Sequence, residues 1–458
     1  MSHPRFLALG ALLALALRLP GPIMAETPTW MAGLSRAKIT PQQPQWMAGY
    51  AGRTHPAEGT LHDLWIKVLA LKTPDGRRAV VVTSDIEGYP GPMYDRICRA
   101  LKQQCGLEAA QLKLTCSHTH SAPVLWECSP DCYPLDDQQQ ALVKQYTLDL
   151  ERTIVAKIAE ALAQLAPATL QAVESQATFA VNRRNNREKE VPEMRLHGES
   201  PKGPSDHGVP ILVVRSPQGA LRAVVFGYAC HSTVLGLYQW SGDYPGFAQL
   251  ALERDHPHCQ AMFYQGCGAD QNPVPRRTVE LCQQYGEQLA AAVNQGLQTP
   301  ARPIAPRLAT ALQIVDLPLQ PLPARVELEK AAAGRDYRAR WSQRMLGLLD
   351  ARQPLPLSYP LPVQAWKLGD QLWISLGGET VVDYALTLKA KYGPQTWVNG
   401  YTNDVIAYIP SQRVWDEGGY EAGGFQACGL ASAGWAAGIE TQLMDTVARL
   451  VRQLQADR

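Results

Sequence analysis

The sequence has no apolar run beyond its first 25 residues that is long enough to cross a bilayer, no pair of cysteines with CxxC spacing and no internal repeat. The first absence predicts a soluble mature protein. The second argues against a cysteine-based zinc site or a thioredoxin-type motif. The chain also lacks an excess of basic residues, with a formal net charge of +1, so nothing indicates a nucleic-acid-binding surface.

The N-terminus begins MSHPRFLALGALLALALRLPGPIMAE, in which Arg5 precedes an apolar run over residues 6–17 and a small-residue pattern ends at Ala25. The alternative is a single membrane helix, but the run is shorter than the roughly 20 residues that a span needs, and Arg18 ends it. We therefore expect a cleaved secretory signal over residues 1–25 and a secreted or periplasmic mature protein. Without this segment the formal charge falls from +1 to −1, because Arg5 and Arg18 are lost.

An oxidising compartment would allow the ten cysteines of the chain to pair. Cys98 lies close in sequence to Cys105, and Cys128 lies close to Cys132. Each pair is a candidate disulfide, although spacing alone does not fix the connectivity. The pattern favours structural cysteines.

Short β-branched or alternating runs indicate strands, and longer runs with a helical repeat lie between them. Charged residues make up 19% and hydrophobic residues 46% of the chain, as in a compact globular protein. Because the element types alternate irregularly, we expect a mixed α/β (α+β) fold with β-sheets packed centrally and helices outside, in a single large domain over residues 26–458. The predicted strands cover residues 64–72, 78–85, 111–116, 209–214, 222–230 and 371–376, and the predicted helices cover residues 137–165, 278–297, 325–349 and 438–456.

Two segments are expected to lie outside these elements. The polar segment from Asn182 to Asp206 is too long and too hydrophilic for a turn, and it predicts a loop over the surface or over the mouth of a site. The proline-rich residues 354–362 are expected to connect a charged helix to the final strands, either as a subdomain border or as a surface connection.

Five polar stretches follow predicted strands, which is where α/β proteins usually assemble their sites. Each contains a group that can bind a metal or move a proton. Histidine is scarce, at ten residues, and three of the histidines fall in two of these stretches. The stretches are CSHTHSAP (116–123), YACHSTVLG (228–236), YQGCGADQNP (264–273), LGGETVVDY (376–384) and GYTNDVIAYIPS (400–411).

His118 and His120 give the strongest signal, because residues two apart on extended backbone point to one face and both imidazoles can reach one site. Each of the other groups also has an ordinary structural explanation. A strand-end His231 is often a hydrogen-bonded structural residue, Glu379 after two glycines can begin a helix, and Tyr408 on a strand can be a half-buried aromatic. The residues alone leave a metal site and a structural explanation open.

Taken together and in order, the five stretches resemble those of the zinc-dependent neutral/alkaline non-lysosomal ceramidases and their bacterial relatives. The resemblance runs from WMAGYAGR (46–53) to GGYEAGG (418–424). It implies a ceramidase-like catalytic domain that binds Zn²⁺. Nitrogen and oxygen ligands suit zinc, and water on zinc has a pKa of about 7, which suits amide hydrolysis. The implied zinc ligands are His118, His231, Glu379 and Tyr408.

The resemblance also implies roles for residues around the metal. His120 would stand beside the metal and orient the water or pass a proton. Tyr420 would donate a hydrogen bond to the tetrahedral oxyanion. Arg183 would bind a carboxylate or polar head group at the mouth of the site, although a solvated loop arginine is the ordinary alternative. Asp85 and Asp243 match recurrent acidic positions, where we expect structural or ligand-orienting roles.

One loop departs from the family pattern. Ceramidases carry a serine in a GDVSPN loop, whereas this chain reads GCGADQNP and has Gln271 at that position. Because glutamine is no nucleophile, zinc-bound water must attack, with Asp270 or Gln271 positioning the water or the substrate. Cys267 is an alternative nucleophile, although a buried or paired cysteine explains it as well. The family's C-terminal β-sandwich domain is also expected to be absent from this chain.

These observations predict an exported zinc-dependent amidohydrolase that cleaves the amide bond of an N-acylated small molecule or lipid, with ceramide named by resemblance alone. Two alternatives stay open: a hydrolase of another small amide or ester, and a non-catalytic lipid- or glycan-binding protein on the same scaffold. We expect no nucleic-acid partner and no membrane contact beyond a peripheral one. The sequence predicts no particular oligomeric state.

Overall fold

The computed structural model of the chain describes residues 1 and 29–456. Apart from Met1, the predicted secretory signal lies outside the described residues. Within them, no helix is both long and apolar enough to cross a membrane.

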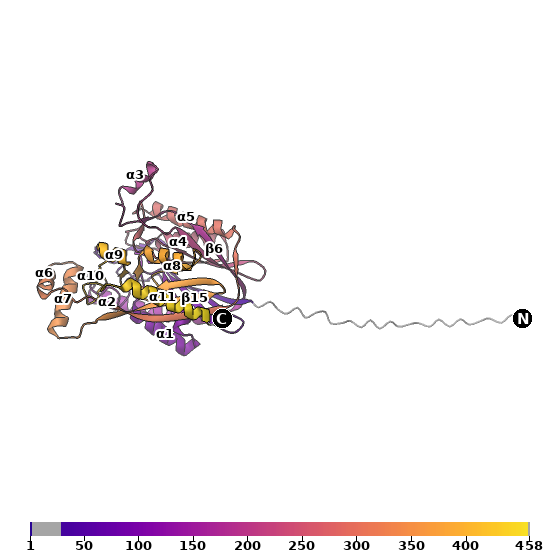
Figure 1. Ribbon diagram of the computed structural model, residues 1–458, viewed down its shortest axis with the longest axis horizontal. Coiled ribbons are helices and arrows are strands. Elements are labelled where there is room, and N and C mark those ends of the chain that lie inside the picture. The colour runs from indigo at the N-terminus through magenta and orange to yellow at the C-terminus, as the bar shows by residue number, and fades with distance from the viewer. Residues whose placement is uncertain (2–28, 457–458) are drawn as a thin grey trace.

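Figure 1 shows the arrangement of the elements. The strands are β1 (Trp30–Lys38), β2 (Gly59–Thr60), β3 (Trp65–Lys72), β4 (Arg78–Ser84), β5 (Leu112–Cys116), β6 (Ala166–Gln176), β7 (Ala180–Asn182), β8 (Gly208–Arg215), β9 (Leu221–Tyr228), β10 (Gln239–Trp240), β11 (Gln260–Gln265), β12 (Gln271–Pro273), β13 (Arg302–Ile304), β14 (Leu308–Pro318), β15 (Ser358–Leu368), β16 (Gln371–Leu376), β17 (Glu379–Thr380), β18 (Trp397–Asn399) and β19 (Tyr408–Ile409). The helices are α1 (Gly91–Cys105), α2 (Asp137–Ala163), α3 (Val191–Leu196), α4 (Asp243–Asp255), α5 (Val279–Leu297), α6 (Arg325–Ala332), α7 (Tyr337–Asp350), α8 (Val382–Tyr392), α9 (Gln412–Glu417), α10 (Phe425–Cys428) and α11 (Ile439–Ala456).

Two sheets form the centre of the molecule. The main sheet has the strand order β11-β9-β8-β6-β1-β3-β4-β5, and β13 pairs with β6. It is mixed, because the pairs β4–β5 and β9–β11 are parallel whereas β1–β3 and β8–β9 are antiparallel. The second sheet has the order β14-β15-β16-β18. The mixed α/β fold class is confirmed.

The two sheets pack face to face, and helices cover their outer faces. One buried cluster joins Leu69 and Val81 of the main sheet to Trp366 and Trp373 of the second sheet. Helices α1 and α2 pack on one half of the outer face of the main sheet, and α4 and α5 pack on the other half. Helices α8 and α11 pack on the second sheet, where Figure 1 shows α11 lying along β15. The result is a helix-sheet-sheet-helix arrangement of four layers.

Strand β4 shows how the sequence specifies this layering. Val80 and Val82 face helices α1 and α2, whereas Val81 faces the second sheet. Successive side chains of a strand point to opposite faces, so a strand covered on both faces is apolar at nearly every position. Each valine buried in this way contributes roughly 1.5–3 kcal/mol.

The predicted strands and helices are found near their expected bounds, but one predicted helix is divided in two. Residues 325–349 form α6 and α7, which are separated by a short turn. Gly334 lies in that turn, and glycine weakens a helix. The carboxylate of Asp336 then accepts hydrogen bonds from the backbone N–H groups of Arg338 and Ala339, which caps the start of α7.

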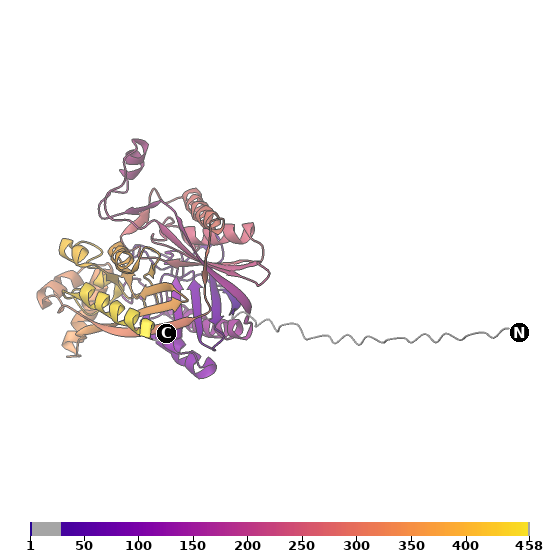
Figure 2. The same cartoon turned by 45° about the vertical axis from the view of Figure 1, so that its right-hand side comes forward.

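The long polar segment is a loop, as expected, but it begins with β7 and contains the short helix α3. Figures 1 and 2 both show α3 standing clear of the body of the molecule. The proline-rich segment is a connection only in part, because β15 already begins at Ser358. Pro360 and Pro362 pair with β14 before β16 joins at Val363, so their missing N–H groups cost no hydrogen bond to β16.

All ten cysteines lie among the described residues, and all are free thiols. The candidate pair Cys98 and Cys105 is excluded by geometry. Both lie on helix α1 seven positions apart, which separates their Cα atoms by about 10 Å along the axis. A disulfide requires less than about 7 Å. Cys128 and Cys132 are likewise unpaired.

Candidate metal centre and active site

The five polar stretches follow β5, β9, β11, β16 and β18, and they meet where the two sheets adjoin. Two single-residue bridges each join a strand of one sheet to a stretch that follows a strand of the other sheet. Thr115 pairs with Thr402, and Gly266 pairs with Asn399. The site is therefore built from loops that leave both sheets at the carboxyl ends of their strands.

His118 and His120 point their side chains to a common point, although not for the expected reason. The backbone of His118 has a φ of 56°, in the left-handed region that non-glycine residues rarely adopt, so the pair is not on extended backbone. His118 Nδ1 donates a hydrogen bond to the carbonyl oxygen of Glu87 at 2.6 Å. This leaves His118 Nε2 free, and it lies 3.1 Å from His120 Nε2.

Gly49 and Arg53 hold His120 in place. Gly49 has a φ of +91°, and a Cβ atom at this position would lie 2.2 Å from Cγ of His120. Only glycine permits this approach of the backbone to the ring. From another direction, Arg53 Nη2 donates to the backbone carbonyl of His120 at 2.8 Å. The imidazole is thus fixed before any ligand binds.

His231 follows β9 and is completely buried. Its Nδ1 donates to the carbonyl of Gly268 at 2.8 Å, and its backbone N–H donates to the carbonyl of Gln271 at 2.9 Å. Among the described residues, its Nε2 has no hydrogen-bond partner. A purely structural role would account for the hydrogen bond of Nδ1. It would not account for the burial of Nε2 without a hydrogen-bond partner.

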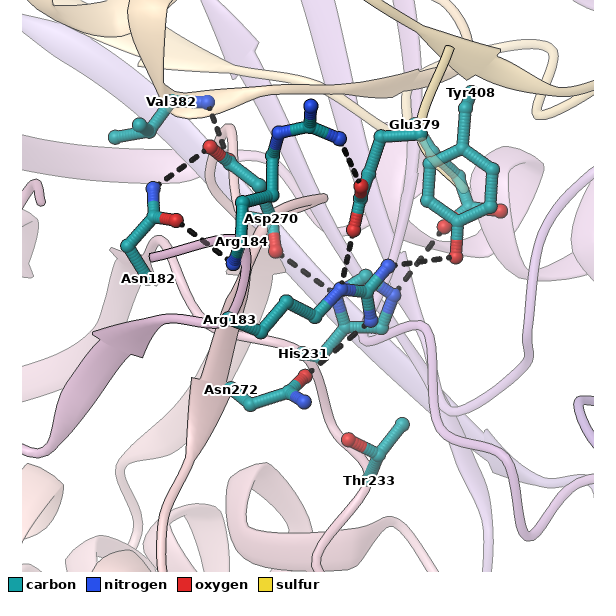
Figure 3. A network of polar contacts seen from close by, with 12 residues as sticks. Asn182, Arg183, Arg184, His231, Thr233, Asp270, Asn272, Glu379, Val382 and Tyr408 are labelled. Atoms are coloured by element: carbon teal, nitrogen blue, oxygen red, sulfur yellow. Dashed lines mark hydrogen bonds and ion pairs between the residues drawn. The ribbon is translucent and has the colours of Figure 1, made fainter. Parts of the chain in front are cut away.

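Glu379 and Tyr408 are brought together by strand pairing. They are direct partners in the parallel pair of β17 and β19, so Glu379 does not begin the following helix, which starts at Val382. Gly378 permits this pairing, because its φ is +72° and a Cβ atom there would lie 2.4 Å from the side chain of Ile409. Figure 3 shows Glu379 and Tyr408 beside each other and next to His231.

The arrangement of these atoms fits a divalent metal. Oε2 of Glu379 lies 3.2 Å from Nε2 of His118 and 3.3 Å from Nε2 of His231, yet it is buried without a hydrogen bond in the described part of the chain. The candidate ligand atoms of His118, His120 and His231 lie within 4.8 Å of one another. Imidazole nitrogens and a carboxylate oxygen are ligands that zinc accepts. The expected ligands are His118, His231, Glu379 and Tyr408. The structure adds His120 as a further possible ligand.

Electrostatics favour the neutral forms of His120 and His231 and the ionised form of Glu379. Burial lowers the pKa of His231 to about 4, and the charge of Arg183 acts in the same direction. Burial also lowers the pKa of His120 well below its ordinary value. Burial raises the pKa of Glu379, but the charge of His118 outweighs burial and holds that pKa well below its ordinary value. In return, burial lowers the pKa of His118, but the charge of Glu379 outweighs burial and raises it. Neutral imidazoles and an ionised carboxylate are the species that ligate metals.

Arg183 connects the centre to the rim of the site (Figure 3). Its Nη2 donates to the hydroxyl of Tyr408 at 3.2 Å, and its Nε donates to the carboxylate of Glu421 at 2.7 Å. The guanidinium also lies 5.6 Å from the centre of the Tyr420 ring. Burial lowers the pKa of Arg183, but the charges of Tyr408 and Glu421 outweigh burial and raise it. Arg183 is therefore a support for Tyr408 rather than a solvated loop arginine.

Tyr420 lies at the mouth of the site. Its side chain is half exposed, at 57%, and its ring centre lies 5.1 Å from that of Tyr408. It lines a cavity of about 110 Å³ on the metal side and a groove of about 920 Å³ on the outer side. The groove is also lined by Arg184, Arg187 and Glu188. The Tyr420 side chain is accessible to a molecule that enters from the groove.

Asp270 does not reach the cavity. Its carboxylate accepts hydrogen bonds from the backbone N–H of Val382 at 2.8 Å and from the amide of Asn182 at 2.9 Å (Figure 3). Burial raises the pKa of Asp270 to about 6. The side chain joins β7 to the start of α8, which explains its presence without a role in positioning water.

Gln271 and Cys267 are also turned away from the cavity. The side chain of Gln271 accepts from the backbone N–H of Asp206 at 3.2 Å and donates to the carbonyl of Ala229. Cys267 is completely buried in the core between α8 and the second sheet. Among the residues that line the cavity, neither appears. The expected positioning roles of Asp270 and Gln271 therefore have no support in the geometry.

Asp85 and Asp243 have structural surroundings, in agreement with expectation. The carboxylate of Asp243 accepts from the backbone N–H groups of Val234 and Leu235, which fixes the loop after His231. Asp85 accepts from the backbone N–H of Trp65 at 3.0 Å. Both hold backbone around the site.

Sequence reasoning missed several residues that line the cavity. Glu87 had a detectable signal, because it lies in TSDIEG at the end of β4, where Asp85 was singled out. The others carry no local pattern that would place them next to a metal. The missed residues are Glu87, Cys128, Cys132, Tyr133, Tyr337 and Cys428.

Comparison with solved structures identifies a similar fold. The neutral ceramidase from Pseudomonas aeruginosa superposes with a TM-score of 0.67 at 18% identity, over 88% of this chain and 73% of that protein. The chain has the fold of a neutral ceramidase. A ceramidase complexed with C2 gives a TM-score of 0.66 at 17% identity, over 89% of this chain and 73% of that chain. No family model and no curated protein sequence matches the chain. The expected likeness in fold is confirmed by structure rather than by overall sequence similarity.

Proposed function

We propose that this protein is a zinc-dependent amidohydrolase that cleaves the amide bond of an N-acylated compound. The observation that carries the proposal is the convergence of three buried atoms, in which Glu379 Oε2 lies 3.2 Å from His118 Nε2 and 3.3 Å from His231 Nε2. A scaffold that served for binding alone would have no need to bury Glu379 Oε2 and His231 Nε2 without hydrogen bonds. The similar solved structures include a ceramidase complexed with C2, which supports a lipid amide as the substrate class.

His118, His231, Glu379 and Tyr408 would hold the metal, and His120 lies close enough to join them. When bound in such a site, Zn²⁺ lowers the pKa of a water molecule and polarises the carbonyl of the substrate. The backbone carbonyls of Glu87 and Gly268 fix the ring orientation of His118 and His231, as the outer partners of metal-binding histidines usually do.

The remaining residues would act on the substrate. His120 is neutral, because burial lowers its pKa well below its ordinary value, and a neutral imidazole can take a proton from the attacking water. Tyr420 would donate a hydrogen bond from its accessible hydroxyl to the oxygen that becomes negative in the tetrahedral state. Arg183 keeps the Tyr408 oxygen in place through a 3.2 Å hydrogen bond. Gln271 stands where the family has its serine, and glutamine is no nucleophile, so direct attack by water is the proposed path.

We further propose that the protein is exported and acts on its substrate outside the cytoplasm, as its N-terminal segment predicts. Contact with a membrane would be peripheral, through delivery of a lipid amide to the groove beside Tyr420. This groove carries charged side chains such as Arg184, Arg187 and Glu188, which suit contact with the polar surface of a membrane better than entry into its hydrocarbon interior.

Metal analysis and activity of a Glu379→Gln variant test the proposal. The purified protein is expected to hold one zinc ion and to cleave a short-chain ceramide in a chelator-sensitive manner that added zinc restores. Glu379→Gln removes the anionic ligand, and we expect loss of metal together with loss of turnover. Glu329→Gln makes the same change at an exposed side chain on α6 that pairs with Arg325, and it should keep both. Full activity of the Glu379→Gln variant would refute the zinc mechanism.

Two further outcomes separate the alternatives. Bound zinc without ceramide cleavage would favour a hydrolase of another small amide or ester. Unchanged ligand affinity in a metal-free Glu379→Gln variant would favour a binding protein, because the ligand would then be held without the metal.

A further inference from the structure

The cavity beside the metal centre contains one carboxyl group that the proposed mechanism does not use. Glu87 follows β4 and lines the cavity together with His118, His120 and Glu379. Within the described residues, the Glu87 side chain makes no hydrogen bond and no ion pair. Its backbone carbonyl accepts a hydrogen bond from His118 Nδ1 at 2.6 Å. The carboxyl group therefore borders the reaction site with no partner from the protein.

The backbone that carries Glu87 is rigid. Its carbonyl oxygen also accepts from the thiol of Cys116 at 3.3 Å. At Gly88, a Cβ atom would lie 2.5 Å from the side chain of Val405, so the two loops are in close contact. The N–H of Val405 donates to the carbonyl of Tyr89 at 2.8 Å. Because the residues on both sides of Glu87 are fixed, the backbone position from which its side chain extends is fixed as well.

The charges of the cavity explain what such a group can recognise. The lining residues include two carboxyl groups, Glu87 and Glu379, and no lysine or arginine. Glu379 belongs to the metal centre, which leaves Glu87 for the substrate. Glu87 is partly buried, and its carboxyl oxygens can accept a hydrogen bond from a donor that a ligand supplies. A negatively charged group on the substrate would be repelled at this position.

The size of the cavity restricts which part of the substrate enters it. Its volume is about 110 Å³, which is below the roughly 300–1,000 Å³ of a site that encloses a whole drug-sized ligand. A small polar head therefore fits beside the metal, and a long acyl chain must extend toward the mouth at Tyr420.

We infer that Glu87 is a specificity-determining residue, which binds a hydrogen-bond donor on the amine half of the substrate, close to the scissile amide. This inference rests on the proposed function and narrows it to N-acylated amino alcohols or N-acylated diamines. A hydroxyl and an ammonium group share the required chemistry, and the carboxyl group excludes substrates with an acidic amine half, such as N-acyl amino acids.

Three hexanoyl amides of equal length distinguish these substrates: the amides of ethanolamine, of ethylenediamine and of propylamine, of which the last has no donor beyond the amide. For the zinc-loaded protein we expect kcat/KM for a donor-bearing amide to exceed that of the propylamide by about 10- to 100-fold, as for hydrogen bonds to a charged group. Preference for the ethanolamide indicates a hydroxyl, and preference for the mono-acylated diamine indicates an ammonium group.

The variants Glu87→Ala and Glu87→Gln test the assignment. Both should keep the zinc content, and Glu87→Ala should lose the preference for either donor. Glu87→Gln keeps an acceptor but no charge, so it should lose the preference for the ammonium group while it keeps part of any preference for the hydroxyl. Glu329→Gln serves as the matched control and should behave as the unaltered protein. Equal kcat/KM values for the three amides, or a preference that survives in Glu87→Ala, would overturn the inference.

Binding of the same three amides, measured by calorimetry, separates this inference from the proposed function. Glu87-dependent selectivity in binding without cleavage would sustain the recognition and refute the amidohydrolase. Cleavage of the amides without Glu87-dependent selectivity would sustain the amidohydrolase and refute the recognition. Neither binding nor cleavage of any of them would refute both.

Discussion

Asp404 offers a test of the packing around the site through the pH dependence of stability. Its side chain is buried, and one carboxylate oxygen accepts a hydrogen bond from the Tyr359 hydroxyl at 2.7 Å. The other oxygen, Oδ1, has no partner among the described residues. Burial raises the pKa of Asp404 from 3.8 to about 7. The native state therefore keeps a proton that the unfolded chain releases, and folding becomes less favourable as pH rises from about 4 to about 7.

The size of the effect follows from these pKa values. One pKa unit corresponds to about 1.4 kcal/mol, and about two such units lie between pH 5 and pH 7. Asp404→Asn removes the titration and keeps the acceptor for Tyr359. We expect the stability of this variant relative to the unaltered protein to increase by about 2–3 kcal/mol between pH 5 and pH 8.5.

Urea unfolding followed by circular dichroism at both pH values measures this difference. Effects of pH on the metal centre occur in both proteins, so they cancel in the comparison. Asp370→Asn, at an exposed carboxylate that pairs with Arg307, controls for the chemical change. A stability difference between Asp404→Asn and the unaltered protein that is the same at pH 5 and pH 8.5 would refute a buried, proton-holding Asp404.

Three further changes test other parts of the structure. Gly49→Ala should destabilise the fold by at least about 1–2 kcal/mol, because the backbone there is left-handed, and it should weaken zinc binding by displacing His120; denaturant unfolding and zinc titration check both effects. Lys113→Met should raise stability by about 1–3 kcal/mol at pH 7, because burial lowers the pKa of Lys113 well below its ordinary value and its charge costs stability below pH about 10. The gain should shrink in unfolding experiments at pH 10. Lys113 Nζ lies 4.6 Å from the ring centres of Trp366 and of Trp373, and a loss of stability at pH 7 would show that these rings compensate the charge. Ser411→Ala should cost about 1 kcal/mol in thermal unfolding, because the Ser411 hydroxyl caps helix α9, and no change would contradict the cap.

Much of the fold could be predicted because the relevant signals are local. The apolar runs of β3 and β4 and the helical repeat of α2 specify their elements within a few residues. The turn between α6 and α7 was also readable from Gly334 and Asp336, but the apolar spacing on both sides concealed it. In the proline-rich segment, the position of β15 depends on which neighbour pairs with it, and the sequence of the segment does not contain that information.

The candidate site divides in the same way. Polar residues at strand ends, together with the resemblance, placed His118, His231, Glu379 and Tyr408 in one region, and the structure brings them together. The environment of Gln271 could not be predicted, because its side chain turns toward Asp206 and Ala229, which lie far away in sequence. Glu87 had a signal in TSDIEG, but the sequence does not show that the loop at Val405 packs against the neighbouring Gly88. Such contacts are set by how the two sheets dock.

The division of the candidate ligands between two sheets has a consequence for the maturation of the protein. His118 and His231 follow strands of the main sheet, whereas Glu379 and Tyr408 follow strands of the second sheet, more than 140 positions further along the chain than His231. A nascent chain that has only reached the end of the main sheet holds the imidazoles without the carboxylate. At the proposed zinc site, high-affinity metal uptake would have to wait until Glu379 and Tyr408 are synthesised and the second sheet has docked. In an exported protein, this order would leave loading to the metal supply of the destination compartment, and the ion itself would lock the two sheets together.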